Sequence, residues 1–155
     1  MLKLEEFYLS DLIEESVHSS RALALNKNLS LNFESSDDGG SFHGDEDLIR
    51  RMVVNLLDNA IKYTPDGGSV SVKLWRVDGW IKLRVTDNGI GIPAEAATRV
   101  FERFYRVDKA RSRAEGGSGL GLPIVKWIAE AHHGAVSLES LPEQGSSFTV
   151  SLPAG

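Results

Sequence analysis

Four polar residues near the middle of the sequence recur at helical spacing. Asn55, Asn59, Lys62 and Tyr63 are separated by 4, 3 and 1 positions, so on a helix they project to one side over about two turns. An amide oxygen is a suitable ligand for a hard cation such as Mg²⁺. An ammonium group can pair with a phosphate, and a phenol ring offers a flat face to a nucleobase. The alternative is an ordinary amphipathic helix with one wet face.

A carboxylate followed by two glycines comes next along the chain. Asp87 precedes Gly89 and Gly91 in the segment 87–93, directly after a predicted strand. Glycine lets the backbone turn sharply and approach a ligand closely. A carboxylate in an apolar pocket can accept a hydrogen bond from an exocyclic amine, such as that of adenine. A tight turn stabilised by the aspartate side chain would give the same pattern without a ligand.

The glycine-rich segment 116–123 runs directly into a predicted helix. Its closely spaced glycines expose backbone N–H groups and the helix start adds positive potential, so the segment favours a phosphate. Pro123 suits the first helical turn, where no N–H is needed. A flexible linker is the alternative, but a linker rarely ends in a well-formed amphipathic helix. The segment matches neither a Walker A loop, which needs Gly-Lys-Ser/Thr, nor the dinucleotide-binding fingerprint.

Aromatic and basic residues are mixed between positions 99 and 113. Phe101 and Phe104, three positions apart, are expected to anchor a short helix to the body of the domain. An arginine fork is well shaped for phosphate oxygens, and a solvated basic loop is the simpler alternative. The positive residues of this segment are Arg99, Arg103, Arg106, Lys109, Arg111 and Arg113.

The other polar clusters favour structural roles. No two histidines have metal-ligand spacing, and His132 and His133 are expected at the C-terminal end of a helix, where the helix dipole stabilises a partly charged imidazole. The acidic run 45–47 indicates a helix start rather than a metal cluster. The three tryptophans are expected to pack rather than to hold a cofactor.

Hydrophobic periodicity predicts the elements that position these residues. Ser10 is expected to cap the first helix, Asp45 to cap the second and Gly134 to stop the third. Asp78 and Gly79 predict a hairpin turn. The expected helices cover residues 10–26, 45–63 and 120–133, and the expected strands cover residues 29–33, 70–74, 81–85, 135–140 and 147–152. This order predicts an α/β (α+β) sandwich, with about three helices over one face of a mixed, mainly antiparallel sheet.

Length and composition suit one domain spanning residues 1–155. The mass of 16.9 kDa, with 41% apolar and 25% charged residues, is ordinary for a globular protein. The absence of cysteine excludes a disulfide scaffold, a thiolate zinc site and a cysteine nucleophile. No apolar run predicts a membrane span, and the first residues are not expected to form a signal peptide. The net charge of −5 argues against a general nucleic-acid binder.

Taken in order, the four motifs resemble those of the catalytic and ATP-binding domain of sensor histidine kinases. The resemblance runs from about Phe7 to Pro153, and four motifs in one order are far more specific than any one of them. The segments that look like the family's N box, first glycine box, F box and second glycine box are residues 55–64, 87–93, 101–106 and 117–122.

The resemblance implies the Bergerat ATP-binding fold, with ATP and Mg²⁺ as cofactors. Asn59 would hold the Mg²⁺ that bridges the phosphates, and Asn55 would lie one turn before it. Tyr63 would flank the adenine, and Asp87 would accept a hydrogen bond from the adenine amino group.

The remaining implied roles concern the phosphates and a lid. Lys62 and Arg106 would meet the phosphates and are the expected catalytic residues. Residues 94–116 would form a mobile lid that hinges at residues 117–121. The other residues expected to contact the nucleotide are Gly89, Gly91, Ile92, Tyr105, Gly117, Ser118, Gly119, Leu120 and Gly121.

Position 55 separates two branches of this fold. Similar topoisomerase, mismatch-repair and chaperone ATPases place there a glutamate that activates water, whereas Asn55 cannot take a proton at neutral pH. The resemblance therefore implies a kinase that transfers the γ-phosphoryl group of ATP to a histidine. None of the four histidines stands in a His-Glu/Asp-x-x-Thr/Asn-Pro context, so the acceptor is expected on a helical dimerisation hairpin before residue 1. A response regulator receiver domain is the expected downstream partner.

Several alternatives stay open. A serine kinase or anti-sigma factor of the same fold would use a serine of another protein, a stand-alone ATPase would hydrolyse ATP, and a pure interaction module would bind no nucleotide. The resemblance implies a cytoplasmic location, within the cytoplasmic portion of a membrane-bound sensor. No contact of this domain itself with membrane or nucleic acid is expected.

Overall fold

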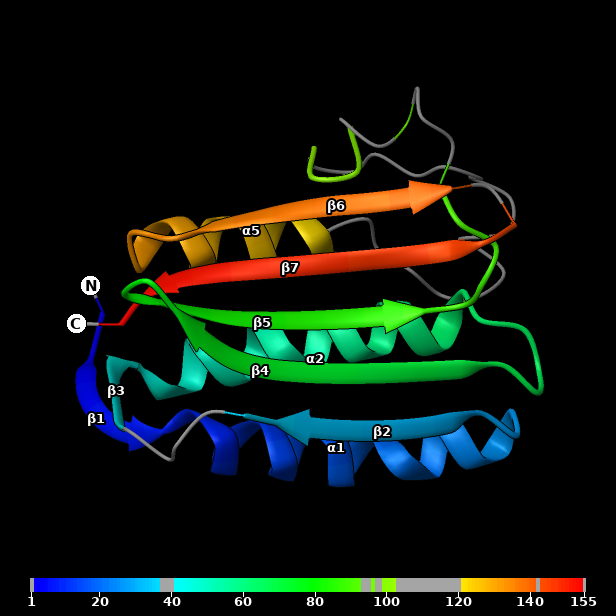
Figure 1. Ribbon diagram of the computed structural model, residues 1–155, viewed down its shortest axis with the longest axis horizontal. Coiled ribbons are helices and arrows are strands. Elements are labelled where there is room, and N and C mark those ends of the chain that lie inside the picture. The colour runs from blue at the N-terminus through cyan, green and yellow to red at the C-terminus, as the bar shows by residue number, and fades with distance from the viewer. Residues whose placement is uncertain are drawn as a thin grey trace.

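The computed structural model describes residues 2–36, 41–92, 96, 99–102, 121–141 and 143–154. Within this part of the chain, three helices cover one face of a five-stranded sheet (Figure 1). The elements in chain order are β1 Leu4–Tyr8, α1 Leu9–Asn26, β2 Ser30–Ser35, β3 Ser41–Asp45, α2 Glu46–Lys62, β4 Ser69–Val77, β5 Trp80–Asp87, α5 Gly121–Ala131, β6 Ala135–Leu141 and β7 Gly145–Pro153.

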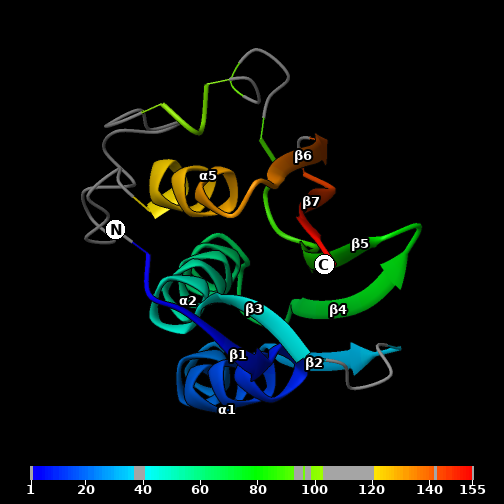
Figure 2. The same ribbon diagram turned by 90° about the vertical axis from the view of Figure 1, so that its left-hand side faces the viewer.

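The main sheet has the strand order β2-β4-β5-β7-β6. Strands β2 and β4 pair in parallel, and the other neighbours pair antiparallel. Seen end-on, α1, α2 and α5 lie in a row beside the strands (Figure 2). The prediction of two layers with a mixed, mainly antiparallel sheet is therefore confirmed.

The long hairpin β4–β5 forms the centre of the sheet. Alternate residues of β4 and β5 are buried against the helices, among them Val72 and Leu83. The turn residues Asp78 and Gly79 have φ values of 50° and 80°, as a two-residue hairpin with the favoured twist requires. The hairpin predicted at these two residues is confirmed.

Helix α2 runs through the middle of the helical layer. Its N-cap is Asp45, whose carboxylate accepts a hydrogen bond from the Leu48 backbone N–H at 3.1 Å, as predicted. Hydrogen bonds from the Lys3 and Leu48 backbone N–H groups lower the pKa of Asp45. The buried side of the helix consists of Ile49, Met52, Val53, Leu56, Leu57, Ala60 and Ile61. Each of the larger side chains contributes roughly 1.5–3 kcal/mol by leaving water.

The start of α1 differs from the prediction. Its N-cap is Tyr8, which makes no side-chain cap hydrogen bond, and the helix begins at Leu9. The chain enters α1 directly from strand β1, so an extended residue stands at the N-cap and Ser10 lies within the first turn. The expectation that Ser10 caps this helix is wrong.

The small sheet formed by β1 and β3 was not predicted from the sequence. These strands pair antiparallel, with Leu4 opposite Asp45. Most of β1 is exposed, so it shows no alternation of apolar and polar residues that would predict a strand.

Helix α5 ends close to the predicted position, but a different residue from the predicted one ends it. The left-handed residue that closes the helix is His133, with φ 64°, and not Gly134. The Gly134 N–H donates to the Ala129 carbonyl at 2.8 Å and the His133 N–H to the Glu130 carbonyl at 3.0 Å, which is a Schellman motif. Glycine is needed at 134 because a Cβ there would collide with the Ser151 carbonyl oxygen.

Candidate functional site

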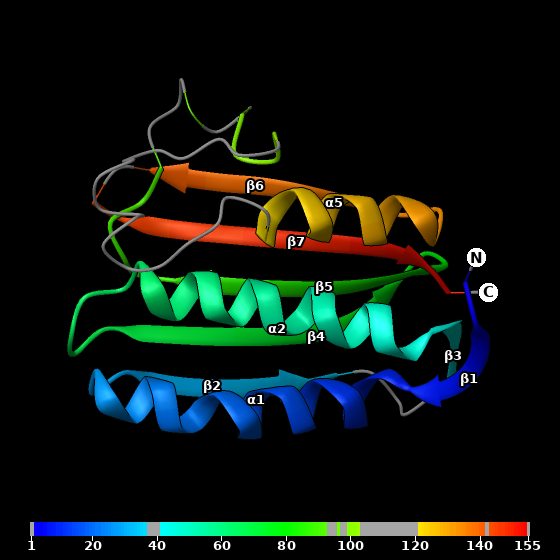
Figure 3. The same cartoon turned by 180° about the vertical axis from the view of Figure 1, so that it is seen from behind.

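The expected site residues that the structure describes lie on the C-terminal half of α2, in and just after the end of β5, and at the start of α5. Helices α2 and α5 lie side by side on the sheet, and the start of α5 lies beside the middle of α2 (Figure 3). The amide Nδ2 of Asn55 lies 3.5 Å from the carbonyl oxygen of Gly121, the first residue of α5. The N box and the end of the second glycine box, which are far apart in sequence, are therefore neighbours in space.

The polar side of α2 is arranged as its spacing predicts. Asn55, Asn59, Lys62 and Tyr63 are all partly exposed, whereas their apolar neighbours on the helix are buried. Lys62 is the last helical residue and Tyr63 is the C-cap. Of the four, Asn55 lies nearest the start of α5, and Tyr63 lies next to the loop that follows β5.

Asp87 is a buried carboxylate at the end of β5. It is 6% exposed, and its Oδ1 accepts a hydrogen bond from the Gly89 backbone N–H at 2.9 Å. Burial raises its pKa, and hydrogen bonds from the Gly89 and Ser146 backbone N–H groups offset part of this rise. A carboxylate held this way is a fixed acceptor for a donor from a ligand.

The Asp87 turn is fastened to the end of α2. The Ile90 N–H donates to the Tyr63 carbonyl oxygen at 3.3 Å. A Cβ on Gly89 would collide with that same oxygen, so the close approach requires glycine. The backbones that carry Tyr63 and Asp87 are consequently held in one fixed arrangement.

The outer side of the same turn is fastened to the hairpin β6–β7. The Ile92 N–H donates to the Ser140 Oγ at 2.7 Å, and the Glu143 N–H donates to the Ile90 carbonyl at 2.6 Å. Gly91 has φ 73°, a value that favours glycine. Ser140 was not among the predicted site residues, because it lies 48 positions from Ile92 and belongs to none of the four motifs.

Phe101 anchors the aromatic-basic segment as expected. Its ring meets the Phe148 ring of β7 edge-to-face, with centroids 6.0 Å apart. The neighbouring Val100 is 5% exposed. This end of the segment therefore packs on the core.

Several expected site residues lie outside the described part of the chain. They are Phe104, Tyr105, Arg106, Gly117, Ser118, Gly119 and Leu120, together with all of the expected lid 94–116 except residues 96 and 99–102. Their expected roles stay predictions.

A metal at this site would rely on amide oxygen and not on a carboxylate cluster. Within the residues that the structure describes, no three His, Asp or Glu side chains are grouped so that they could hold an ion. The amide oxygen of Asn59 is a hard donor on the partly exposed side of α2, which suits Mg²⁺. Mg²⁺ commonly takes few protein ligands and keeps waters and phosphate oxygens, so this donor set fits.

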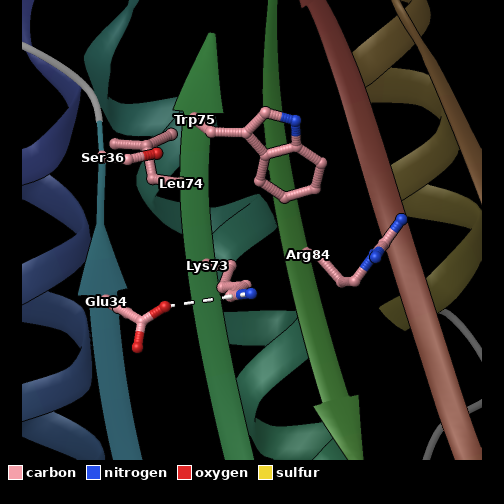
Figure 4. Close-up of a pocket in the computed structure, with 6 residues that line it drawn as sticks. All are labelled: Glu34, Ser36, Lys73, Leu74, Trp75 and Arg84. Atoms are coloured by element: carbon pink, nitrogen blue, oxygen red, sulfur yellow. Dashed lines mark ion pairs between the residues drawn. The ribbon is translucent and has the colours of Figure 1, made fainter.

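A shallow hollow of about 300 Å³ lies elsewhere, on the open face of the sheet (Figure 4). Its charged groups have partners within the hollow, since Lys73 Nζ lies 3.8 Å from Glu34 Oε2 and the Arg84 guanidinium lies over the Trp75 ring at 5.1 Å. The hollow contains none of the motif residues. The hollow is therefore separate from the expected site residues.

No helix in the described residues is both long and apolar enough to cross a membrane.

A family model described as "Histidine kinase-, DNA gyrase B-, and HSP90-like ATPase" matches residues 44–155. The sensor-like histidine kinase SenX3 of Mycolicibacterium smegmatis is 44% identical over 150 residues, which is 97% of this chain and 39% of SenX3. The chain therefore spans about two fifths of the length of this curated relative.

Solved structures of histidine kinases share the fold. The nucleotide-free catalytic domain of histidine kinase ThkA superimposes with a TM-score of 0.88 at 24% identity, over 99% of this chain and 97% of that domain. ThkA has also been solved in complex with the response regulator protein TrrA. Full-length ShkA in complex with AMPPNP gives a TM-score of 0.87 at 28% identity, over 99% of this chain and 31% of ShkA.

Proposed function

The chain belongs to the histidine kinase-, DNA gyrase B- and HSP90-like ATPase family, as the catalytic domain of a sensor histidine kinase, and from this premise we propose that it binds MgATP and presents the γ-phosphoryl group to a histidine on a separate helical domain. The observation that carries the proposal is the geometry of Asp87. This carboxylate is buried, is held by backbone N–H groups, and is fastened to the end of the helix that bears Asn59, Lys62 and Tyr63.

The adenine end of the nucleotide is assigned to Asp87 and Tyr63. A desolvated carboxylate accepts strongly from an exocyclic amine, and its fixed position discriminates against a base that lacks the amine. The Tyr63 ring, at the C-cap of α2, offers an aromatic face beside the base. AMPPNP, the ligand in the ShkA structure, carries the same adenine and a triphosphate-like chain.

The phosphate end is assigned to Lys62 and Asn59. Lys62 supplies an ammonium charge one residue before the C-cap of α2. Asn59 would hold Mg²⁺ through its amide oxygen, and the ion would neutralise phosphate charge when bound. Tyr105, Arg106 and Gly117 to Gly121 complete the proposed phosphate and lid contacts.

Asn55 favours transfer to a protein over hydrolysis. Its amide group is directed to the Gly121 carbonyl and cannot act as a base. With no base at this position, positioning and charge neutralisation are what the site offers to phosphoryl transfer. The histidine that accepts the phosphoryl group is assigned to a helical dimerisation domain of the same kinase.

A response regulator receiver domain is the proposed final acceptor. The support is the ThkA structure, which holds the response regulator TrrA. We place the domain on the cytoplasmic side of a membrane-bound sensor, as the resemblance to sensor kinases implies.

Isothermal titration with MgADP tests nucleotide binding. We expect wild type to bind, and Asp87→Asn to weaken affinity by about tenfold or more, because an amide N–H₂ replaces one acceptor oxygen. Asp66→Asn, in the exposed loop after α2, is the matched control and should bind as wild type does. No heat with wild type, or equal affinity of Asp87→Asn, contradicts the proposal.

Transfer needs a second assay. Adding the helical domain of the parent kinase and radiolabelled ATP should yield an acid-labile, base-stable phosphoprotein. Label that is stable to acid would point to serine and count against a histidine kinase.

A further inference from the structure

Building on the proposed nucleotide site, we propose that Lys27, at the end of α1, is a positioning residue for that site. It holds the last turn of α2, which carries Lys62 and Tyr63, in the orientation that the nucleotide needs. Lys27 lies in none of the four motifs and does not belong to α2.

The Lys27 ammonium group caps the C-terminal end of α2. Its Nζ donates to the Ile61 carbonyl oxygen at 2.9 Å and to the Lys62 carbonyl oxygen at 3.1 Å. The last carbonyl groups of a helix have no partners within the helix and carry partial negative charge. A half-buried cation that donates to two of them therefore fixes both the position and the direction of this turn.

The backbone that carries Lys27 is held in a closed turn at the end of α1. Lys27 is the C-cap of α1, and the next residue, Asn28, is left-handed with φ 56°. The Leu29 N–H donates to the Ala24 carbonyl at 2.9 Å, which closes α1 in a Schellman motif. The capping group on α2 is thus built on a rigid turn.

The same residue also holds the far side of the α2–β4 loop. The carbonyl oxygen of Lys27 accepts from the Gly67 N–H at 3.1 Å, and the neighbouring Ser30 N–H donates to the Gly68 carbonyl at 3.0 Å. Lys27 therefore hydrogen-bonds to both ends of the segment 61–67, through its ammonium group at Ile61 and Lys62 and through its carbonyl oxygen at Gly67. Tyr63 lies between these ends.

Movement of this turn would reach the adenine end of the site. The Tyr63 carbonyl accepts from Ile90, and a Cβ on Gly89 would collide with it, so the Asp87 turn follows the end of α2. The Lys27 ammonium also donates to the Lys62 carbonyl oxygen, so it holds the backbone from which the Lys62 side chain extends. The hydrogen bonds from Lys27 thereby position both the adenine end and the phosphate end of the proposed site.

A purely stabilising role is the competing explanation, and the chain offers a matched control. Arg21, also on α1, donates from Nη1 to the Leu31 carbonyl on β2 at 2.8 Å. Replacing either side chain with methionine removes a long-range bond from a cation to a backbone carbonyl. Of these two bonds, that of Lys27 reaches α2, whereas that of Arg21 reaches β2.

The experiment compares wild type with Lys27→Met, Lys27→Arg and Arg21→Met. The thermal unfolding midpoint of each protein is measured first. The affinities for MgADP and adenosine are then measured at a temperature well below the lowest of these midpoints, where every protein is folded. We expect Lys27→Met to weaken both ligands by about tenfold, as lost hydrogen bonds to a charged group would. Lys27→Arg should recover most of this loss. Arg21→Met should lower the thermal midpoint to a similar extent and keep the affinity within about twofold of wild type.

Wild-type affinity in a folded Lys27→Met, or an equal loss in Arg21→Met, overturns the inference. If Lys27→Met does not fold, Lys27→Gln replaces it, and wild-type affinity of that variant has the same meaning. Failure of the wild-type chain to bind either ligand would instead reject the proposed function, and the positioning role with it.

Discussion

The imidazole of His132 accepts a hydrogen bond from the backbone N–H of Asp45, with a distance of 3.0 Å between Nε2 and the nitrogen. This bond joins the end of α5 to the residue that caps α2, 87 positions away. The other ring nitrogen, Nδ1, lies 2.9 Å from the Ile128 carbonyl, so Nδ1 carries the proton. His132 lies just past the C-terminal end of α5, where the sequence placed it, and its Nε2 serves as the acceptor for the Asp45 N–H.

Replacement of His132 with phenylalanine should destabilise the fold. Phenylalanine has a similar size and keeps contact with Phe42, whose ring centroid lies 6.1 Å from that of the imidazole. It leaves the Asp45 N–H buried without an acceptor, which costs roughly 1–3 kcal/mol. Urea denaturation should show this drop in the free energy of unfolding.

The control for this variant is His43, which is exposed on β3. His43→Asn should stay within about 0.5 kcal/mol of wild type. An equal loss in both variants would mean that the bond to Asp45 contributes nothing specific.

His133→Gly should stabilise the protein. His133 has φ 64°, where a side chain strains the backbone and glycine does not, so we expect a gain of about 0.5–1 kcal/mol in the free energy of unfolding. Gly134→Ala should do the opposite, because its Cβ would meet the Ser151 carbonyl oxygen. Thermal unfolding of the two variants should move the midpoint in opposite directions, and a fall with His133→Gly would contradict the assignment of strain.

The pH dependence of stability should reveal Asp87. Burial raises the pKa of this group, so the folded state holds its proton more tightly than the unfolded state does. Its contribution is therefore fully present below the unfolded pKa and is lost as pH rises through the folded pKa. We expect the free energy of unfolding of Asp87→Asn, relative to wild type, to rise as pH increases from about 4 towards neutrality.

Urea denaturation at a series of pH values measures this difference. Asp66→Asn, in the exposed loop, serves as the control and should show no such trend. If the free energy of unfolding of Asp87→Asn, relative to wild type, falls with increasing pH, the surroundings of Asp87 stabilise its charged form and the prediction is wrong.

The sequence predicted those parts of the fold whose signal is local. Helix α2 has a capping aspartate and a clear apolar side, and the hairpin β4–β5 has alternating residues and an Asp-Gly turn, so both were placed correctly. Strand β1 lacks such a signal, because it is exposed and pairs with β3 about 40 positions away.

The same distinction applies to the site. The motif residues on α2 and at the end of β5 could be identified from residue type and spacing. Lys27, Ser140 and His132 could not, because each bonds to a backbone group far away in sequence, and every residue carries the same backbone groups. The hydrogen bonds that fix the motifs relative to one another can therefore be identified only from the three-dimensional structure.

Lys62→Met should separate the two ends of the nucleotide site. If Lys62 meets phosphate, its loss weakens MgADP by about tenfold, since a charge-assisted contact is removed, and leaves adenosine unaffected. Arg51→Met, an exposed change earlier on α2, is the control and should alter neither affinity. The loss for MgADP should shrink at high salt, because screening weakens the ammonium–phosphate attraction. Titration calorimetry with both ligands distinguishes this residue from Lys27, whose replacement is expected to weaken adenosine as well. Equal losses for adenosine and MgADP in Lys62→Met would contradict a phosphate contact, because adenosine offers no phosphate to lose.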